Sequence, residues 1–194
     1  MSDLLASSRL WVEENYGRSA EHLLKTEEWL RQIEPTASET LLLAALTHDM
    51  ERAFPGPDSP QLVPSWGPDD PIYNQAHMQR SARIVGEYLR GQQAPEAMIV
   101  EVARLIAAHE FGGWPEANLV QAADSLSFLE VNIDFFLKRM EETYTTSNGW
   151  TPDYVRAKFD WMYERIQIPR ARSLAAPLYK SAMGKFRQKA EILR

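Results

Sequence analysis

The sequence predicts an all-α protein, and two observations support that prediction. Apolar residues recur every three or four positions through most of the 194 residues, a spacing that places them on one face of a helix. No segment shows the strict apolar–polar alternation of a half-buried strand. Hydrophobic content of 44% and charged content of 25% are ordinary for a folded domain. We therefore expect one helical bundle of about seven helices over residues 1–194.

The first two helices are predicted from their apolar stripes. Residues 3–15 carry leucines and a valine at helical spacing, and a second stripe begins after Gly17 and runs to Ile33. Pro35 then ends the second helix, because proline has no amide hydrogen and clashes with the preceding turn.

The central helix follows Ser38 and contains residues 41–46, which are all apolar. A helix without a polar face is normally buried on all sides. This helix runs directly into His48 and Asp49. An imidazole and a carboxylate at the end of a buried segment are costly unless a hydrogen-bond partner, an opposite charge or a metal ion compensates their lost hydration.

Residues 55–72 contain six prolines and are predicted to form a long irregular loop. Long loops in compact domains often act as lids or binding loops. The alternative is a disordered surface insertion. Trp66 and the pair Leu62-Val63 favour a loop that packs against the rest of the molecule.

Helical spacing returns after this loop. Glycine and proline divide the remaining sequence into separate apolar stripes. The predicted helices cover residues 73–90, 96–110, 116–142, 151–166 and 173–193.

The composition excludes several classes of protein. The chain has no cysteine, so disulfides, zinc–thiolate sites and thiol nucleophiles are excluded, which suits a reducing cytoplasm. No segment has the pattern of a signal peptide or the length of a membrane span. A net charge of −6 argues against binding to extended nucleic acid. We expect a cytoplasmic protein that does not bind membranes, and its oligomeric state stays open.

Several ionisable residues do not fit their apolar surroundings. Each of the four histidines falls in a different predicted helix, and one aspartate stands between alanines and a leucine. A lone buried histidine is more often a hydrogen-bonded core residue than a ligand, and a buried aspartate can pair with arginine. The joint pattern favours a metal site, because four imidazoles and two carboxylates suit two divalent first-row metals. The six residues are His22, His48, Asp49, His77, His109 and Asp124.

The order of these six residues resembles the HD-domain superfamily of metal-dependent phosphohydrolases. The similarity covers about residues 18–136, and it includes the apolar run LLLAALTHDMER and the segment AADSLSFLEV, where Ala123 replaces the first aspartate of a family motif. The superfamily's core site would comprise His22, His48, Asp49 and Asp124. Members with two metals add two histidines, here His77 and His109.

The resemblance implies a single HD-type helical domain with its metal-binding core at about 18–136 and C-terminal helices at about 151–193. It implies a metal-dependent phosphohydrolase that acts on a small phosphorylated molecule, with a nucleotide as one candidate. The cofactor would be two divalent metal ions of iron, manganese, cobalt, nickel or zinc. A di-iron oxygenase with the same six ligands and a non-catalytic metal-stabilised sensor are the alternatives.

Two departures disfavour one branch of that superfamily. The cyclic-dinucleotide phosphodiesterases have glycine-lysine after the histidine-aspartate doublet, whereas this chain has Glu51-Arg52. Their additional GYP motif is also absent.

The expected mechanism needs no side-chain nucleophile. Two metals bridged by Asp49 would lower the pKa of a bound water, which would then attack the phosphoryl group. Arg52, three residues later, is the first candidate for binding phosphate at the catalytic centre. Three other cations lie three or four residues from a candidate ligand on the same helical face, although a solvated surface charge is the ordinary alternative for each. These candidate substrate-binding residues are Arg18, Lys25 and Arg80.

Other roles stay open. Spacing does not select a general acid or base among Glu51, Asp70 and Glu110. Trp66 and Trp114 follow ligand helices and could stack on a base or sugar, whereas core packing is the ordinary role of a tryptophan.

Overall fold

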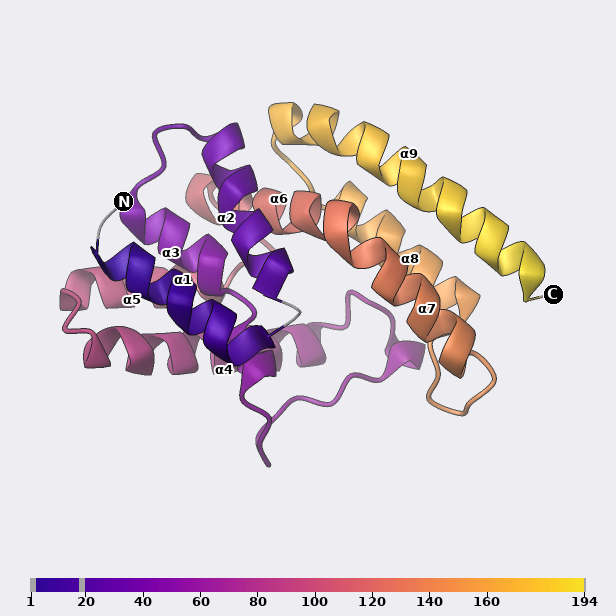
Figure 1. The fold of residues 1–194 in the computed structure, drawn as a ribbon, viewed down its shortest axis with the longest axis horizontal. Coiled ribbons are helices and arrows are strands. Elements are labelled where there is room, and N and C mark those ends of the chain that lie inside the picture. The colour runs from indigo at the N-terminus through magenta and orange to yellow at the C-terminus, as the bar shows by residue number, and fades with distance from the viewer. Residues whose placement is uncertain (1–2, 18–19, 194) are drawn as a thin grey trace.

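The chain is described here by a computed structural model that covers residues 3–17 and 20–193. Within these ranges the regular structure is helical and contains no β-strand, which confirms the all-α prediction (Figure 1). The α-helices are α1 (Asp3–Tyr16), α2 (Ala20–Ile33), α3 (Glu39–Thr47), α4 (Pro71–Gly91), α5 (Glu96–Ile106), α6 (Pro115–Ser127), α7 (Ile133–Thr143), α8 (Pro152–Glu164) and α9 (Pro169–Ile192).

Helix α3 lies at the centre of the N-terminal half and contacts α1, α2, α5 and α6. Every residue from Leu41 to Thr47 is buried, as the apolar run predicts. The helix begins after Ser38, whose hydroxyl accepts a hydrogen bond of 3.3 Å from the Leu41 amide. It ends at His48, and the 3₁₀ turn η2 (Met50–Ala53) follows Asp49. The buried helix thus holds the His48-Asp49 doublet inside the core.

The predicted helix over residues 116–142 is a continuous rod in which a π-helical turn, η4 (Phe128–Asn132), joins α6 to α7. The backbone keeps right-handed helical angles at both junctions. Helix α6 packs against α2 and α9. A π-helical turn holds more residues than an α-helical one, so it shifts the side-chain positions that follow it.

The expectation that every histidine lies within a helix is corrected at two positions. His48 is the C-terminal cap of α3, and α5 ends at Ile106, so His109 lies in the turn that follows. The amides of Ala108 and His109 donate to the carbonyls three residues earlier, which is the pattern of a turn. Gly112 and Gly113, further along, have φ angles of +69° and +122°, which favour glycine.

The proline-rich loop is irregular, as predicted, apart from the 3₁₀ turn η3 (Pro64–Trp66). Arg80 of α4 binds its first part, donating hydrogen bonds of 2.7 Å to the Phe54 carbonyl and 3.0 Å to Asp58 Oδ1. The side-chain amide of Asn74 donates a hydrogen bond of 3.2 Å to the Pro68 carbonyl. The loop is therefore tied to α4 at both ends, whereas Trp66 is 59% exposed.

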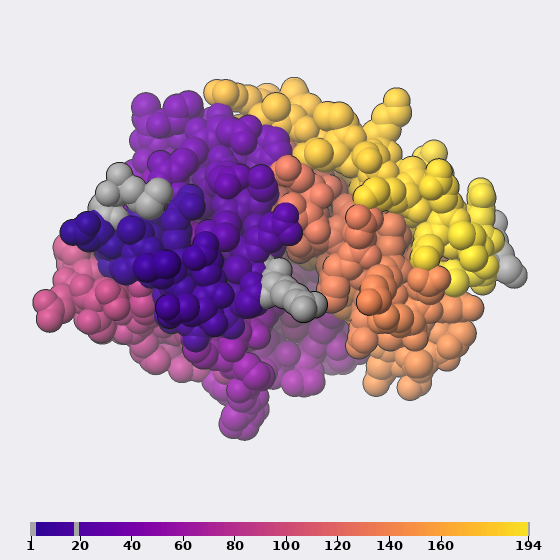
Figure 2. All heavy atoms as spheres, in the orientation of Figure 1, coloured from indigo at the N-terminus to yellow at the C-terminus, as the bar shows by residue number. Residues whose placement is uncertain are grey.

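The C-terminal helices cover the other end of the molecule. Figure 2 shows α7, α8 and α9, in orange and yellow, beside the helices that precede them in the sequence. Helix α9 begins at Pro169, earlier than predicted, because proline fits the first turn of a helix. Among the helices that the structure describes, none is both long and apolar enough to cross a membrane.

Candidate metal centre

The four histidines of the chain form a row of buried imidazoles. The ring centroids are 5.4 Å apart from His22 to His48, 4.8 Å from His48 to His109 and 5.4 Å from His109 to His77. Residues that are far apart in the sequence, on α2, α4 and the ends of α3 and α5, meet at this place. The structure thus brings together the four histidines that the sequence singled out.

Each imidazole is held through its Nδ1 atom. His48 and His109 lie 2.9 and 2.8 Å from the carbonyl oxygens of Ala45 and Ile106. A carbonyl oxygen only accepts, so both Nδ1 atoms carry the hydrogen, and the neutral rings keep a lone pair on Nε2.

The other two rings are held by side chains. His77 Nδ1 lies 3.0 Å from Glu51 Oε1, and His22 Nδ1 lies 2.9 Å from Ser127 Oγ. The Ser127 hydroxyl donates to the His22 carbonyl at 2.7 Å, so it accepts from the ring. In metal sites, such outer hydrogen bonds fix the tautomer and orientation of the ligating histidine.

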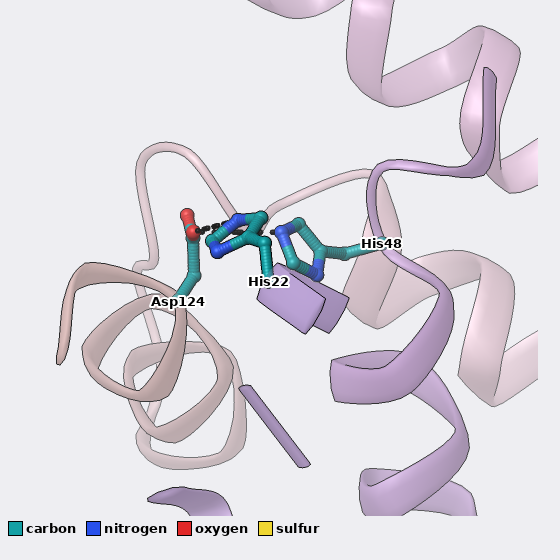
Figure 3. A group of neighbouring side chains, drawn as sticks. All are labelled: His22, His48 and Asp124. Atoms are coloured by element: carbon teal, nitrogen blue, oxygen red, sulfur yellow. Dashed lines mark ion pairs between the residues drawn. The ribbon is translucent and has the colours of Figure 1, made fainter. Parts of the chain in front are cut away.

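The Nε2 atoms face two aspartates. Asp124 Oδ1 lies 3.2 Å from His22 Nε2 and 3.4 Å from His48 Nε2 (Figure 3). Asp49 Oδ1 lies 2.8 Å from His77 Nε2 and 3.9 Å from His109 Nε2. The six predicted ligands therefore form one cluster, with Asp124 beside one pair of histidines and Asp49 beside the other pair.

Glu110 is a further candidate ligand, which the sequence suggested only as an acid or base. Its Oε1 lies 3.8 Å from His109 Nε2, and its carboxylate is buried. The cluster contains three groups of three residues, and within each group the ligand atoms lie within 4.8 Å of one another. The first and second groups share His48, and the second and third share His109. These groups are His22, His48 and Asp124; His48, Asp49 and His109; and His77, His109 and Glu110.

The donors fit divalent metal ions. The Nε2 atoms of His48, His77 and His109 are buried and make no hydrogen bond of acceptable geometry within the described residues. Two nitrogen or oxygen ligands at about 2.1 Å from one ion are at most about 4.2 Å apart. The Nε2–carboxylate distances of 2.8–3.9 Å fall within that limit. Imidazole and carboxylate donors suit first-row divalent metals.

Arg165 holds two of the carboxylates and was not identified from the sequence. Its guanidinium donates one hydrogen bond to Asp124 Oδ2 and another to Glu110 Oε2. Its Nε atom donates to Ser125 Oγ at 2.8 Å. Because Arg165 occupies the outer oxygens, Oδ1 of Asp124 and Oε1 of Glu110 face the histidines.

The charges of the cluster are strongly coupled. Burial opposes ionisation of Asp49, but Arg52 and His77 hold its pKa well below the usual range. Burial likewise opposes ionisation of Asp124, and Arg165 and His48 hold its pKa well below the usual range. Burial alone would lower the pKa of His48, but Asp124 and Asp49 raise it to about 9. A positive charge is therefore favoured between these carboxylates.

Two adjoining cavities open beside the cluster. An inner one of about 70 Å³ is lined by Asp49, Glu110 and Asp124 together with side chains from α8. An outer one of about 540 Å³ is lined by Phe135, Phe136 and other residues. Both share His22, Asp49 and Arg52, so the cluster is accessible from the outer groove.

Of the predicted cations, Arg52 lies at the site. Its Nε atom is 3.0 Å from Asp49 Oδ2, and its side chain is 43% exposed and lines both cavities. Arg80 binds Glu51, Phe54 and Asp58 and lines neither cavity.

Another of the predicted cations lies away from both cavities. Lys25 pairs with Glu28 at 2.8 Å and also lines neither cavity. Arg18 lies outside the described residues.

The remaining candidates are also placed. Asp70 caps α4, accepting from the amides of Ile72 and Tyr73. Trp66 is exposed, and the Arg104 guanidinium carbon lies 4.4 Å from the centroid of the Trp114 ring. Neither tryptophan lines the cavities. Trp150 lines both cavities instead. No local pattern in the sequence indicated this, because Trp150 lies in the loop that follows α7.

Comparison with known proteins gives a match at the level of a family. A family model described as "Domain of unknown function (DUF4202)" matches residues 11–147, which is more than half of the chain. No curated protein and no solved structure matches significantly. All six predicted ligands and Glu110 lie inside the matched segment, whereas Arg165 lies beyond it.

Proposed function

Since the chain belongs to the DUF4202 family, whose description assigns no activity, we propose from the geometry of the site that it is a metal-dependent phosphohydrolase. Its substrate would be a small phosphorylated molecule. The observation that supports this most is the row of four buried imidazoles whose Nε2 atoms face carboxylates beside a cavity. The resemblance to the HD-domain superfamily supports the same reading.

Two divalent ions fit the cluster better than one. His22, His48 and Asp124 form one end, and His77, His109 and Glu110 form the other, with Asp49 between them. Bound metals would polarise a phosphoryl oxygen and lower the pKa of water, so no side-chain nucleophile is needed. The metal would be iron, manganese, cobalt, nickel or zinc, all of which accept imidazole and carboxylate ligands.

The charge balance favours an anionic substrate. The carboxylates of Asp49, Glu110 and Asp124 face an equal number of cations, because Arg52 pairs with Asp49, Arg165 pairs with the other two, and Lys158 lines the same cavity. Each divalent ion would add two positive charges. A phosphate monoester, with about two negative charges near pH 7, would neutralise half of the four positive charges that two such ions add.

The chain's own residues supply binding and orientation. Arg52 would bind a phosphoryl oxygen, a role that is supported by its partly exposed side chain, which lines both cavities. The outer groove, with Phe135, Phe136 and Trp150, has room for the organic part of a small substrate. Aromatic faces of this kind bind flat apolar groups.

Metal analysis of protein purified without chelator is the first experiment. We expect two metal ions per chain, and a single ion would restrict the site to one end of the cluster. His48→Ala and Asp124→Ala should lose bound metal while the helical circular dichroism spectrum stays unchanged. Asp153→Ala, at an exposed position on α8, is the matched control and should keep its metal. Full metal content in folded His48→Ala and Asp124→Ala would refute the site.

Activity then separates the proposed hydrolase from an oxygenase. Metal-loaded protein is incubated with a panel of nucleotides and sugar phosphates, and phosphate release is measured. Oxygen consumption by the reduced, iron-loaded protein is measured in parallel. Phosphate release that disappears in His48→Ala supports the proposal, whereas oxygen consumption without phosphate release contradicts it.

A further inference from the structure

Lys158 of α8 lines the inner cavity but has no carboxylate partner. It shares the cavity wall with Asp124 and Glu110. Within the described residues it forms no ion pair, whereas Arg52, Arg80 and Arg165 each form at least one. The nearby carboxylates already have a cationic partner, because Arg165 binds both Asp124 and Glu110. Among the described residues that line this cavity, half-buried Lys158 is therefore a cation that the carboxylates do not bind.

Aromatic rings position the Lys158 ammonium. Its Nζ atom lies 4.3 Å from the Trp161 ring centroid and 5.6 Å from that of Phe128. A cation over an aromatic face is stabilised, but by less than an ammonium group loses when its hydration is removed. In agreement, burial lowers the pKa of Lys158 to about 8, although Glu110 opposes the shift. An anion in the cavity would supply the missing stabilisation.

The position of Lys158 follows from one face of α8. Tyr154, Lys158 and Met162 are four residues apart and all line the inner cavity, as neighbours on a helical face do. Arg165, one turn further, reaches the metal-centre carboxylates. Helix α8 lies beyond the segment that matches the family model, so these residues would complete the site from outside that segment.

We propose that Lys158 is a substrate-binding residue that holds the phosphoryl group of the substrate in the inner cavity, together with Arg52. This inference rests on the proposed function. It names a second cation for the phosphate, and it explains why a lysine lies beside the cluster without a protein partner. It also makes the site select for anionic over neutral substrates.

The first test measures the binding of inorganic phosphate to Mn²⁺-loaded protein by isothermal titration calorimetry. Lys158→Met should weaken phosphate binding about ten- to a hundredfold, the loss of one hydrogen bond to a charged group. Lys158→Arg should keep part of the affinity because it keeps the charge. Lys180→Met removes the same charge from an exposed position on α9 and should bind phosphate as the wild type does.

The second test uses the unmutated protein and so does not depend on how the variants fold. Lysines of the Mn²⁺-loaded protein are acetylated with acetic anhydride, with and without phosphate, and mapped by mass spectrometry. Phosphate should protect Lys158 and leave Lys180 unprotected. Equal labelling of Lys158 in both conditions would overturn the proposal.

The outcomes separate this inference from the proposed function. If wild-type protein binds Mn²⁺ but Lys158→Met binds phosphate equally well, the Lys158 role is refuted and the metal centre stands. If wild-type protein binds no metal, the metal centre is refuted and the Lys158 role falls with it.

Discussion

At the scale of single residues, the most specific feature of the site is the set of hydrogen bonds that hold the histidine Nδ1 atoms. The four Nδ1 atoms bind four separate acceptors: two carbonyls, one hydroxyl and one carboxylate. These bonds orient the rings so that their Nε2 atoms face Asp124 or Asp49. An ordinary core histidine would use both ring nitrogens in hydrogen bonds. Three of these four rings have a buried Nε2 without such a bond. That asymmetry is what a cluster able to hold a metal ion requires.

Arg165→Met tests the buried charges. Removal of the guanidinium leaves Asp124 and Glu110 buried without their main cation, so the metal-free protein should lose about 3–5 kcal/mol of unfolding free energy. Urea unfolding in the presence of a chelator measures the loss. Added Mn²⁺ should reduce the difference in unfolding free energy between Arg165→Met and the wild type, because metal ions neutralise the same carboxylates.

Arg156→Met is the matched control for this change. Arg156 lies on the same helix, is exposed, and pairs with Asp160 at 3.6 Å. An exposed pair contributes at most about 1 kcal/mol. If Arg165→Met is no less stable than Arg156→Met without metal, the guanidinium does not hold the carboxylates in the way described.

Among the elements, α3 provides support for the site rather than chemistry. Its side chains are buried against four neighbouring helices, and it places the doublet at its C-terminal end. The sequence predicted this helix well, because a helix without a polar face is normally stable only when it is buried on all sides. The π-helical turn and the position of His109 after α5 were not predicted, because both depend on how neighbouring helices pack.

Leu43→Ala separates support from ligation. Leu43 is fully buried in the middle of α3, so the shortened side chain should cost about 2–5 kcal/mol of unfolding free energy. Metal stoichiometry of the folded protein should stay at the wild-type value, since the ligands are untouched. Urea unfolding and metal analysis of the same sample check both statements. A folded Leu43→Ala protein with half the metal would show that α3 packing also sets ligand geometry.

At the scale of the whole molecule, the sequence predicted the candidate ligands better than their surroundings. The six residues that the structure brings together could be found because ionisable residues in apolar helices are unusual, and their order resembles a known superfamily. Arg165 could not, since it lies 41 residues from Asp124 and 55 from Glu110 and looks like any surface arginine. Arg80 was expected near phosphate and instead binds the proline-rich loop, because helical spacing does not show which partner a long side chain reaches.

The pH dependence of stability reports on the whole cluster. In the metal-free protein, burial lowers the pKa of His109 to about 3, although Glu110 partly opposes the shift, so stability is lost as pH falls below about 6.5. Burial opposes ionisation of Glu110, but Arg165 lowers its pKa to about 2, so a further loss follows below about 4.5.

His48 has the opposite sign. Its pKa is raised to about 9, so its contribution is complete below about pH 6.5 and is lost as pH rises through 9. We therefore expect the metal-free protein to be most stable near pH 6.5.

Metal binding should change this profile. A metal ligand must be neutral imidazole, so metal displaces the proton that His48 holds below about pH 9 in the metal-free protein. The rise in Tm on adding Mn²⁺ should therefore grow from pH 6 to pH 9, because proton competition weakens. Differential scanning fluorimetry with Mn²⁺ or chelator across this range measures the difference. Asp124→Ala should show no such growth, since it lacks the carboxylate shared by His22 and His48. A wild-type difference that does not change with pH would mean that His48 is not a ligand.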